Sequence, residues 1–385
     1  MSTEPGGFVF VGPQGTVRAS GAATPVCAGS GEPIADAAVR ALAAGGGGDL
    51  VVGAVGFDPS MHALTVPAER FWEPRPAPDD PRLAAPAYPT DRPPTAPAFV
   101  GTRWDQRAEP SAAGYAAAVS RALARIEDGA FEKVVLARSL AVTAPAPVEV
   151  ATVLTRLAAQ HPGAYAFAVD TTRATGPRRT MIGASPELLL SRRGRTVVST
   201  PLAGTVPRST DPAEDARRAA ALVDSAKDRH EHALVVAQVA ERLAPFCGRL
   251  DVPSAPELSA TDTLWHLSSR VEGELSDPAP TALHLATALH PTAAVCGSPT
   301  AEARRALLDL EDVPRGFYTG LVGWCDDAGD GEWAVTIRCA EVSGRRAVLQ
   351  AGAGIVAGSR PEAEVAETTA KFRPLLAALG LEAAP

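Results

Sequence analysis

Two acidic residues and one lysine occur at helical spacing near the end of the 385-residue chain. Glu364, Glu367 and Lys371 stand at positions i, i+3 and i+7 in a segment that follows Pro361. Proline is favoured in the first turn of a helix, and a helix would place these three side chains on one stripe. Such a stripe is usually a solvated face, unless a second charged group gives it a partner.

A second acidic pair, Asp228 and Glu231, has the same spacing in a segment whose apolar periodicity is helical. Two helices could therefore bring four carboxylates to one hard cation. Ligation by oxygen alone suits Mg²⁺, which retains water and often takes an oxygen from an anionic substrate. We therefore expect a magnesium site between the helices that carry these two pairs.

Two further residues have settings that suit proton transfer. Lys133 begins the strand predicted for 132–140 and shares a face with Val135 and Ala137. Removal from water lowers the pKa of a lysine, as a general base requires, although a lysine at the end of a strand can also extend to water. Glu187 lies between a proline and an apolar run. This setting raises a carboxyl pKa, as a general acid requires, and an ion-paired or helix-capping glutamate is the alternative.

Backbone amides and one arginine are the candidate anion-binding groups. Gly352 and Gly354 lie in a run of small residues, which we expect to be a loop that a ligand can approach closely. The segment 200–205 is expected to be a turn that offers amides to an oxyanion. Arg338, on a predicted apolar strand, is a candidate clamp for a carboxylate. The glycine spacing departs from G-x-G-x-x-G, which argues against a dinucleotide loop.

The composition is that of a soluble globular enzyme with one large or two smaller domains: 46% of the residues are hydrophobic and 21% are charged. A formal net charge of −8 argues against a nucleic-acid partner. Five scattered cysteines predict neither a zinc site nor a disulfide framework, and they fit a reduced cytoplasm. We find no targeting segment and no apolar run that could span a membrane.

The order of elements indicates a mixed α and β architecture. We expect residues 1–103 to form a strand-rich part that ends in a proline-rich connection at 74–97, and residues 104–385 to form the catalytic region. Helices are expected at 33–44, at 114–126, within 211–247, at 280–289 and 300–310, and from 361. Strands are expected at 132–140, 165–169, 179–183, 316–324, 333–340 and 346–351.

Taken in order, these segments resemble the chorismate-utilising enzymes, which comprise isochorismate, salicylate, anthranilate and aminodeoxychorismate synthases. The resemblance runs from about residue 115 to residue 376, and it is strongest to the isochorismate synthases. The motifs that carry it are KVVLAR at 133–138, PLAGT at 201–205, DRHEH at 228–232 and HPTAAVCG at 290–297.

The resemblance implies an α+β fold, a large sandwich of two sheets flanked by helices, with chorismate and one Mg²⁺ in a cleft. It implies that Glu231 and Glu367 bind the metal directly, and that Asp228 and Glu364 act through water or as partners of the direct ligands. The substrate-binding residues that it implies are Gly204, Thr205, His266, Thr292, Ala294, Tyr318, Arg338, Gly352, Gly354 and Lys371.

The chemistry implied is isomerisation of chorismate to isochorismate without redox change. Lys133 would remove a proton from a water aimed at C2, and Glu187 would protonate the departing C4 hydroxyl. The product would feed siderophore biosynthesis, through 2,3-dihydroxybenzoate or salicylate, or menaquinone biosynthesis. No amidotransferase partner is expected.

Four alternatives remain within or near this family. Aminodeoxychorismate synthases have a lysine where this chain has Ala203, and anthranilate synthases carry a regulatory motif that we do not find. Salicylate synthases, which also expel pyruvate, tend to have threonine near Ala294. A catalytically silent homologue would have lost Lys133, Glu187 or a metal carboxylate, and all are present.

Overall fold

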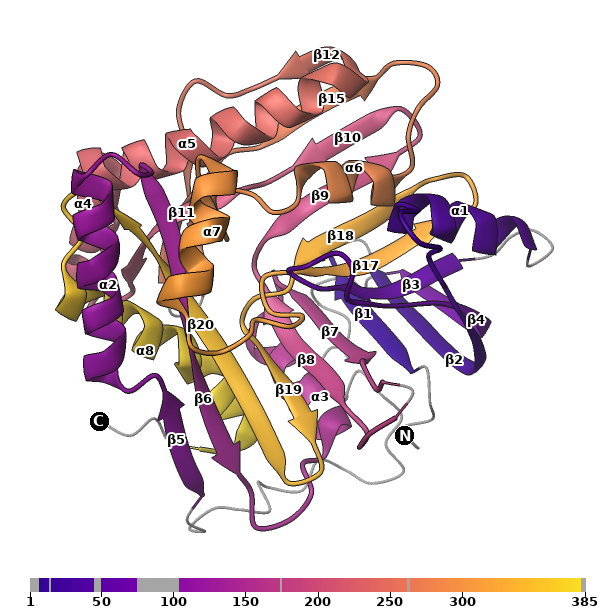
Figure 1. Cartoon of the computed structure of the whole chain (residues 1–385), viewed down its shortest axis with the longest axis horizontal. Coiled ribbons are helices and arrows are strands. Elements are labelled where there is room, and N and C mark those ends of the chain that lie inside the picture. Colours follow the sequence, from indigo (N-terminus) through magenta and orange to yellow (C-terminus); the bar gives the residue numbers. More distant parts are fainter. Residues whose placement is uncertain are drawn as a thin grey trace.

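One antiparallel sheet, folded back on itself, organises the molecule (Figure 1). The structure is a computed structural model that describes residues 7–13, 15–44, 50–74, 104–173, 175–261 and 264–381. In these ranges seventeen strands form the large sheet and three form a small separate sheet. The proline-rich segment at 74–97, apart from Pro74, and the expected division at 103/104 lie outside the described residues.

The first half of the large sheet includes the strand that begins with Lys133 and the strand that contains Gly352 and Gly354. In order of pairing it contains β5 (Asp105–Glu109), β6 (Lys133–Thr143), β20 (Arg346–Val356), β19 (Cys339–Ser343), β8 (Thr180–Ser185), β7 (Tyr165–Asp170) and β1 (Phe8–Gly12). The two-residue strand β16 (Gly297–Ser298) pairs with the start of β6.

The second half continues from β1. Its strands, in order, are β2 (Gly15–Pro25), β4 (His62–Pro74), β3 (Leu50–Val55), β17 (Leu321–Asp326), β18 (Gly331–Val335), β9 (Leu188–Arg193), β10 (Thr196–Ser199), β15 (Val271–Leu275) and β12 (Cys247–Asp251). The small sheet contains β11 (Leu202–Pro207), β14 (Leu264–Ser268) and β13 (Glu257–Ala260).

The two halves pack face to face and helices cover their outer faces. Residues of both halves, among them Phe10, Phe167, Val52 and Trp324, form the core between them. The helices are α1 (Ile34–Ala44), α2 (Ala112–Glu127), α3 (Val150–Gln160), α4 (Pro212–Asp224), α5 (Ala226–Leu243), α6 (Ala282–Leu289), α7 (Thr300–Leu310) and α8 (Pro361–Leu379). Helices α3 and α8 cover the first half, and α1, α5 and α6 cover the second. The predicted α+β sandwich is confirmed, and its two layers are halves of one continuous sheet.

Two helices begin where local capping predicts. Helix α8 has Pro361 in its first turn and ends at Gly380, whose φ of 81° is accessible to glycine without strain. The helical region predicted for 211–247 is divided into α4 and α5 at Ser225, which has extended backbone. The Ser225 hydroxyl accepts a hydrogen bond from the Asp228 amide, so Asp228 lies in the first turn of α5.

The local structures predicted for two glycine-containing segments were wrong. Gly352 and Gly354 lie within strand β20 rather than in a loop. Glycine is required at these positions because a Cβ on Gly352 would lie 2.9 Å from the Leu136 carbonyl oxygen of the neighbouring strand. The segment expected to be a turn at 200–205 contains the start of β11, which bulges at Gly204, where φ is 76°.

The positions of Arg338 and Tyr318 also differ from the prediction. The strand expected at 333–340 is interrupted after Val335, and Arg338 lies in a bend with a φ of 50°. Tyr318 lies in a turn that precedes β17 rather than in a strand. Both side chains therefore come from backbone that leaves the sheet.

Among the described residues, no helix is long and apolar enough to cross a membrane.

Arg138 joins the strand that begins with Lys133 to the helix that carries Glu364 and Glu367. This buried guanidinium on β6 donates hydrogen bonds of 2.9 Å to the Thr368 hydroxyl and 2.6 Å to the Thr369 hydroxyl, both on α8. The position of α8 relative to β6 therefore depends on a planar group with several donors.

We expect Arg138→Lys to lower the free energy of unfolding by roughly 2 kcal/mol, because one ammonium cannot replace all of these hydrogen bonds. Chemical denaturation measures this change. Arg121→Lys, at an exposed position of α2, is the matched control and should leave stability unchanged. Equal stability of the two variants would contradict the role of Arg138.

Candidate active site

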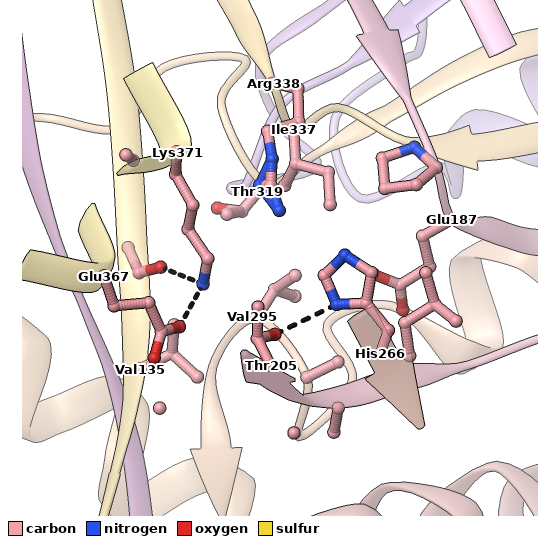
Figure 2. A pocket seen from close by; sticks show the side chains of 18 of the residues that line it. Val135, Glu187, Thr205, His266, Val295, Thr319, Ile337, Arg338, Glu367 and Lys371 are labelled. Atoms are coloured by element: carbon pink, nitrogen blue, oxygen red, sulfur yellow. Dashed lines mark hydrogen bonds and ion pairs between the residues drawn. The ribbon is translucent and has the colours of Figure 1, made fainter. Parts of the chain in front are cut away.

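A polar cavity collects residues from both sheets and from helices α5 and α8 (Figure 2). Most of the predicted site residues line it. These are Glu187, Gly204, Thr205, Asp228, Glu231, His266, Ala294, Tyr318, Arg338, Gly352, Gly354, Glu367 and Lys371. Residues separated by more than half of the chain therefore contribute to one site.

Lys133 and Glu231 form an ion pair beside the cavity. The Lys133 ammonium lies 2.9 Å from Glu231 Oε1, and Lys133 has no exposed surface. The alternative in which Lys133 extends to water is therefore wrong. A Cβ on Gly354 would lie 2.2 Å from Glu231 Oε1 and 3.0 Å from Lys133 Cε. The missing side chain of Gly354 thus makes room for this pair.

Two further carboxylates on α8 also have a lysine nearby. Lys371 donates to Glu367 Oε1 at 2.5 Å and to the Gly352 carbonyl oxygen at 2.8 Å. The Glu364 carboxylate is buried, and its Oε1 lies 3.8 Å from the Lys227 ammonium of α5. Three ammonium groups therefore balance three carboxylates in this structure.

Burial and neighbouring charges shift the pKa values of Asp228, Glu231 and Glu364. Burial and the charge of Glu367 together raise the pKa of Glu364 to about 7, against the opposing effect of Lys227. Burial also raises the pKa of Asp228, with smaller contributions from Glu231 and Glu367. Burial acts to raise the pKa of Glu231 as well, but the charge and the hydrogen bond of Lys133, with the charges of Lys227 and Lys371, together outweigh it, and the pKa lies below its usual value. Acidic side chains of both predicted pairs thus act on Asp228, and those of Glu231 and Glu367 on Glu364, while a metal ion shared by the two pairs stays a prediction.

The carboxylate oxygens of the two acidic pairs suit a hard cation, although three of the four carboxylates are paired with lysines. In the described ranges, no three His, Cys, Asp or Glu side chains already surround one point at metal-binding positions. The available donors are carboxylate oxygens alone, which suits Mg²⁺. A cation would take over the charge balance that the three lysines now provide.

Glu187 is a buried carboxyl with a raised pKa. It lies in the turn between β8 and β9, and 4% of its surface is exposed. Burial raises its pKa to about 7, against the opposing effects of a hydrogen bond from the Leu202 amide and the charge of Lys133. No ion pair of Glu187 is found among the described residues, and it caps no helix. The predicted elevation of its pKa is therefore supported by its surroundings.

His266 presents one unpartnered nitrogen in a buried setting. Its Nδ1 lies 3.0 Å from the Thr205 hydroxyl, a contact between strands β14 and β11. Its Nε2 is buried and has no hydrogen-bond partner in the described part of the chain. Burial, with the charges of Arg338 and Lys371, lowers the pKa of His266 well below its ordinary value. A neutral imidazole that lacks one partner is therefore available to a polar ligand.

Arg338 and Lys371 project into the cavity from one side, while Glu187 and His266 lie across from them (Figure 2). Burial lowers the pKa of the Arg338 guanidinium, but an arginine remains a cation in proteins. No ion pair of Arg338 occurs among the described residues. Its planar fork is suited to a carboxylate. The cavity thus combines a cationic wall with a buried acid.

Some predicted site residues lie behind the cavity wall. Lys133, Glu364 and Thr292 are buried and are not among the residues that line the cavity. Lining residues that the sequence analysis missed are Val135, Pro186, Leu202, Ala203, Val295, Thr319, Ile337, Gln350 and Ala351. Most are small or apolar and belong to motifs that were noted for other residues. Thr319 has a φ of 58°, which no local pattern predicts.

Together, the fold and the cavity bring basic side chains, an acidic cluster and a buried carboxyl with a raised pKa around one polar space, an arrangement suited to a small anion. A family model described as "Chorismate binding enzyme" matches residues 88–380. The isochorismate synthase DhbC of Bacillus subtilis (strain 168) is 48% identical over 390 residues, which cover 98% of this chain and 95% of that protein. The chain belongs to the chorismate-binding enzymes.

Two further similarities agree with this family. The vibriobactin-specific isochorismate synthase of Vibrio cholerae serotype O1 is 45% identical over 273 residues, 71% of this chain and 68% of that protein. A solved structure of a Bacillus anthracis protein, inferred to be a 2,3-dihydroxybenzoate-specific isochorismate synthase, DhbC, has a TM-score of 0.88 and 40% identity. It covers 98% of this chain, and this chain covers 97% of it.

The raised pKa of Glu187 predicts a specific dependence of stability on pH. The folded protein holds this proton up to about pH 7, whereas an unfolded glutamate loses it near pH 4.5. Raising the pH through that interval therefore costs stability. We expect Glu187→Gln to gain up to about 3 kcal/mol in unfolding free energy relative to the wild type between pH 4.5 and pH 8.

Denaturation curves at several pH values measure this difference. Glu362→Gln, at an exposed position of α8, is the control and should show a constant difference from the wild type. A constant difference for Glu187→Gln as well would contradict the raised pKa.

Proposed function

We propose that the protein is an isochorismate synthase, which converts chorismate to isochorismate. The observation that carries this proposal is the buried Glu187, whose pKa of about 7 lets it hold a proton at neutral pH beside a cavity with a cationic wall. The full-length similarity to the isochorismate synthase DhbC supports the same activity. The reaction moves one hydroxyl group and needs no redox cofactor.

The reaction divides the proton transfers between two side chains. Glu187 donates a proton to the C4 hydroxyl as the C4–O bond breaks, and the ring double bonds shift. Water adds at C2 and gives its proton to Lys133, so one water enters for each that leaves. A lysine accepts a proton only as the neutral amine. The Glu231 carboxylate must therefore exchange the Lys133 ammonium for another cation before turnover.

Mg²⁺ is the proposed cation, and when bound it supplies positive charge that holds the ring carboxylate of chorismate. Glu231 and Glu367 would hold it directly, with Asp228 and Glu364 acting through water. The donors at Gly204 and Thr205 would assist at the same carboxylate. The oxygen-only donor set and the coupled protonation of these carboxylates support this assignment.

The second carboxylate of chorismate, on the enolpyruvyl group, is assigned to the cationic wall. Arg338 provides a planar fork, and Lys371, held at the Gly352 carbonyl, provides a second positive charge. Tyr318 lies beside Gly352, since a Cβ there would be 3.1 Å from the Tyr318 hydroxyl oxygen. His266 Nε2 is assigned to a ring hydroxyl because it lacks any other partner.

The cellular setting follows from the product. Isochorismate would enter siderophore or menaquinone biosynthesis, and no amidotransferase is required because water is the nucleophile. We place the enzyme in the cytoplasm, since its five cysteines form no disulfide.

Incubation of the purified protein with chorismate and Mg²⁺, followed by separation of the products, tests the proposed activity. Isochorismate alone is the expected result, because Ala294, which lines the cavity, stands near the position where salicylate synthases tend to have threonine. Salicylate with pyruvate would assign the chain to the salicylate synthases. Absence of turnover would contradict both activities.

Lys133→Ala should reduce turnover to background while Mg²⁺-dependent binding of chorismate remains, because Lys133 is assigned to the attacking water and to neither carboxylate of the substrate. Rapid-mixing assays measure turnover, and calorimetry measures binding. Full activity of this variant would remove Lys133 from the role of base.

The pH dependence of kcat/KM tests Glu187 as the proton donor. Because the donor must be protonated in the free enzyme, kcat/KM should fall as the pH rises above about 7. Glu187→Gln should lower kcat by roughly 10²- to 10⁴-fold. Glu332→Gln, which changes a buried glutamate outside the cavity, is the control and should retain kcat. A wild-type profile that stays flat from pH 6 to pH 9 would contradict the assignment.

A further inference from the structure

The outer edge of strand β6 has a gap beside the cavity. Strand β6 pairs with β20 along its whole length on one edge. On the other edge it pairs with β16 at Lys133 and Val134 and with β5 from Ser139 onwards. Between these two partners, Val135 and Ala137 present backbone groups that no strand satisfies. Unpaired backbone groups in the interior of a protein are costly, so this gap requires other partners.

A buried ion pair, Glu311 and Arg315, fills this gap. Arg315 Nη2 donates to the Val135 carbonyl oxygen at 2.5 Å, and the Ala137 amide donates to Glu311 Oε1 at 2.8 Å. The two side chains join each other through contacts of 2.6 Å and 2.8 Å. The pair thus replaces the missing strand at the Val135 carbonyl and the Ala137 amide.

The same guanidinium also binds two other segments of the cavity wall. Arg315 Nη1 donates to the Val295 carbonyl oxygen at 2.6 Å and to the Thr319 hydroxyl at 3.2 Å. Val135, Val295 and Thr319 all line the cavity, although they come from a strand, a loop and a turn. One side chain therefore joins three parts of the wall.

The chemistry of this contact requires arginine. All five N–H donors of Arg315 are used: one from Nε and one from Nη2 to Glu311, one from Nη2 to Val135, and two from Nη1 to Val295 and Thr319. The guanidinium lies over the Phe57 ring at 4.5 Å from its centroid, and 3% of the side chain is exposed. A lysine has three donors on one atom and cannot reach these directions together.

We propose that Arg315, oriented by Glu311, is a positioning residue that fixes the catalytic cavity by holding Val135, Val295 and Thr319 in one arrangement. Arg315 does not line the cavity and acts through these wall residues. The effect on catalysis rests on the proposed isochorismate synthase activity. Buried ion pairs contribute little net stability but can specify geometry, which is the role assigned here.

Arg315→Lys tests this role, with Arg304→Lys as the matched control. Arg304 lies over the same Phe57 ring, at 5.7 Å, but its ion pair is with Asp58 at the surface, at 3.6 Å. We expect Arg315→Lys to lower kcat per folded enzyme by roughly 10- to 100-fold, because small displacements in an active site have effects of this size. The KM for chorismate should change much less, because Arg338 and Lys371 are retained. Arg304→Lys should keep both constants.

Hydrogen exchange gives a second readout that does not depend on activity. Arg315→Lys should speed amide exchange at 134–137 and 293–297, whereas Arg304→Lys should not. If Arg315→Lys does not fold, Glu311→Gln takes its place, since it keeps an acceptor for Ala137 and removes the ion pair. The same loss of kcat and the same faster exchange are then expected.

The outcomes separate this proposal from the proposed function. A wild-type protein that does not convert chorismate overturns the function, and exchange alone then decides whether Arg315 fixes the wall. Variants that lose thermal stability but keep kcat, KM and the exchange pattern per folded molecule would overturn the positioning role.

Discussion

The structure depends on charged groups that are buried next to partners of opposite charge. Lys133 and Glu231 form such a pair, and neither could be buried alone without a large desolvation cost. Gly354 gives Glu231 the space to reach Lys133. The site is therefore held by electrostatic complementarity between strand β6 and helix α5, with strand β20 passing beside them.

Buried charged groups also connect the elements of the fold to the residues of the cavity. Arg138 connects β6 to α8, and Arg315 connects β6 to the loop and the turn on the opposite wall. Strand β6 thus contacts the acidic cluster at its start, a helix along its length and the cavity wall through a buried ion pair. A shift of this strand would displace Lys133, the carboxylates of the acidic cluster and the cavity wall together.

Much of the site could be predicted from the sequence because its chemistry is encoded in short patterns. The spacing of Asp228 with Glu231 and of Glu364 with Glu367 predicted two acidic helices, and the motif around Lys133 predicted the strand that buries it. Glycine patterns were less informative. Gly352 and Gly354 have the composition of a loop, but they lie in a strand because of contacts with Leu136 and Glu231 that come from distant segments.

Residues in irregular backbone were the hardest to predict. Arg338 has a positive φ, so the periodicity that placed it on a strand was misleading. Tyr318 was also expected on a strand, but it lies in a turn. Glu311 and Arg315 have the spacing of an ordinary pair on a helix surface. Their importance follows only from the gap in the edge of β6, which depends on the pairing of strands far apart in the chain.

The central claim is that helices α5 and α8 share one cation. Titration of Mg²⁺ into the protein, in the presence of chorismate and its product at their equilibrium ratio, tests this claim most directly. Calorimetry should find one Mg²⁺ per chain, and Glu231→Gln and Glu367→Gln should each weaken its binding by roughly 10- to 100-fold or more. Glu332→Gln should bind Mg²⁺ like the wild type. Unchanged affinity in both the Glu231 and Glu367 variants would contradict the account.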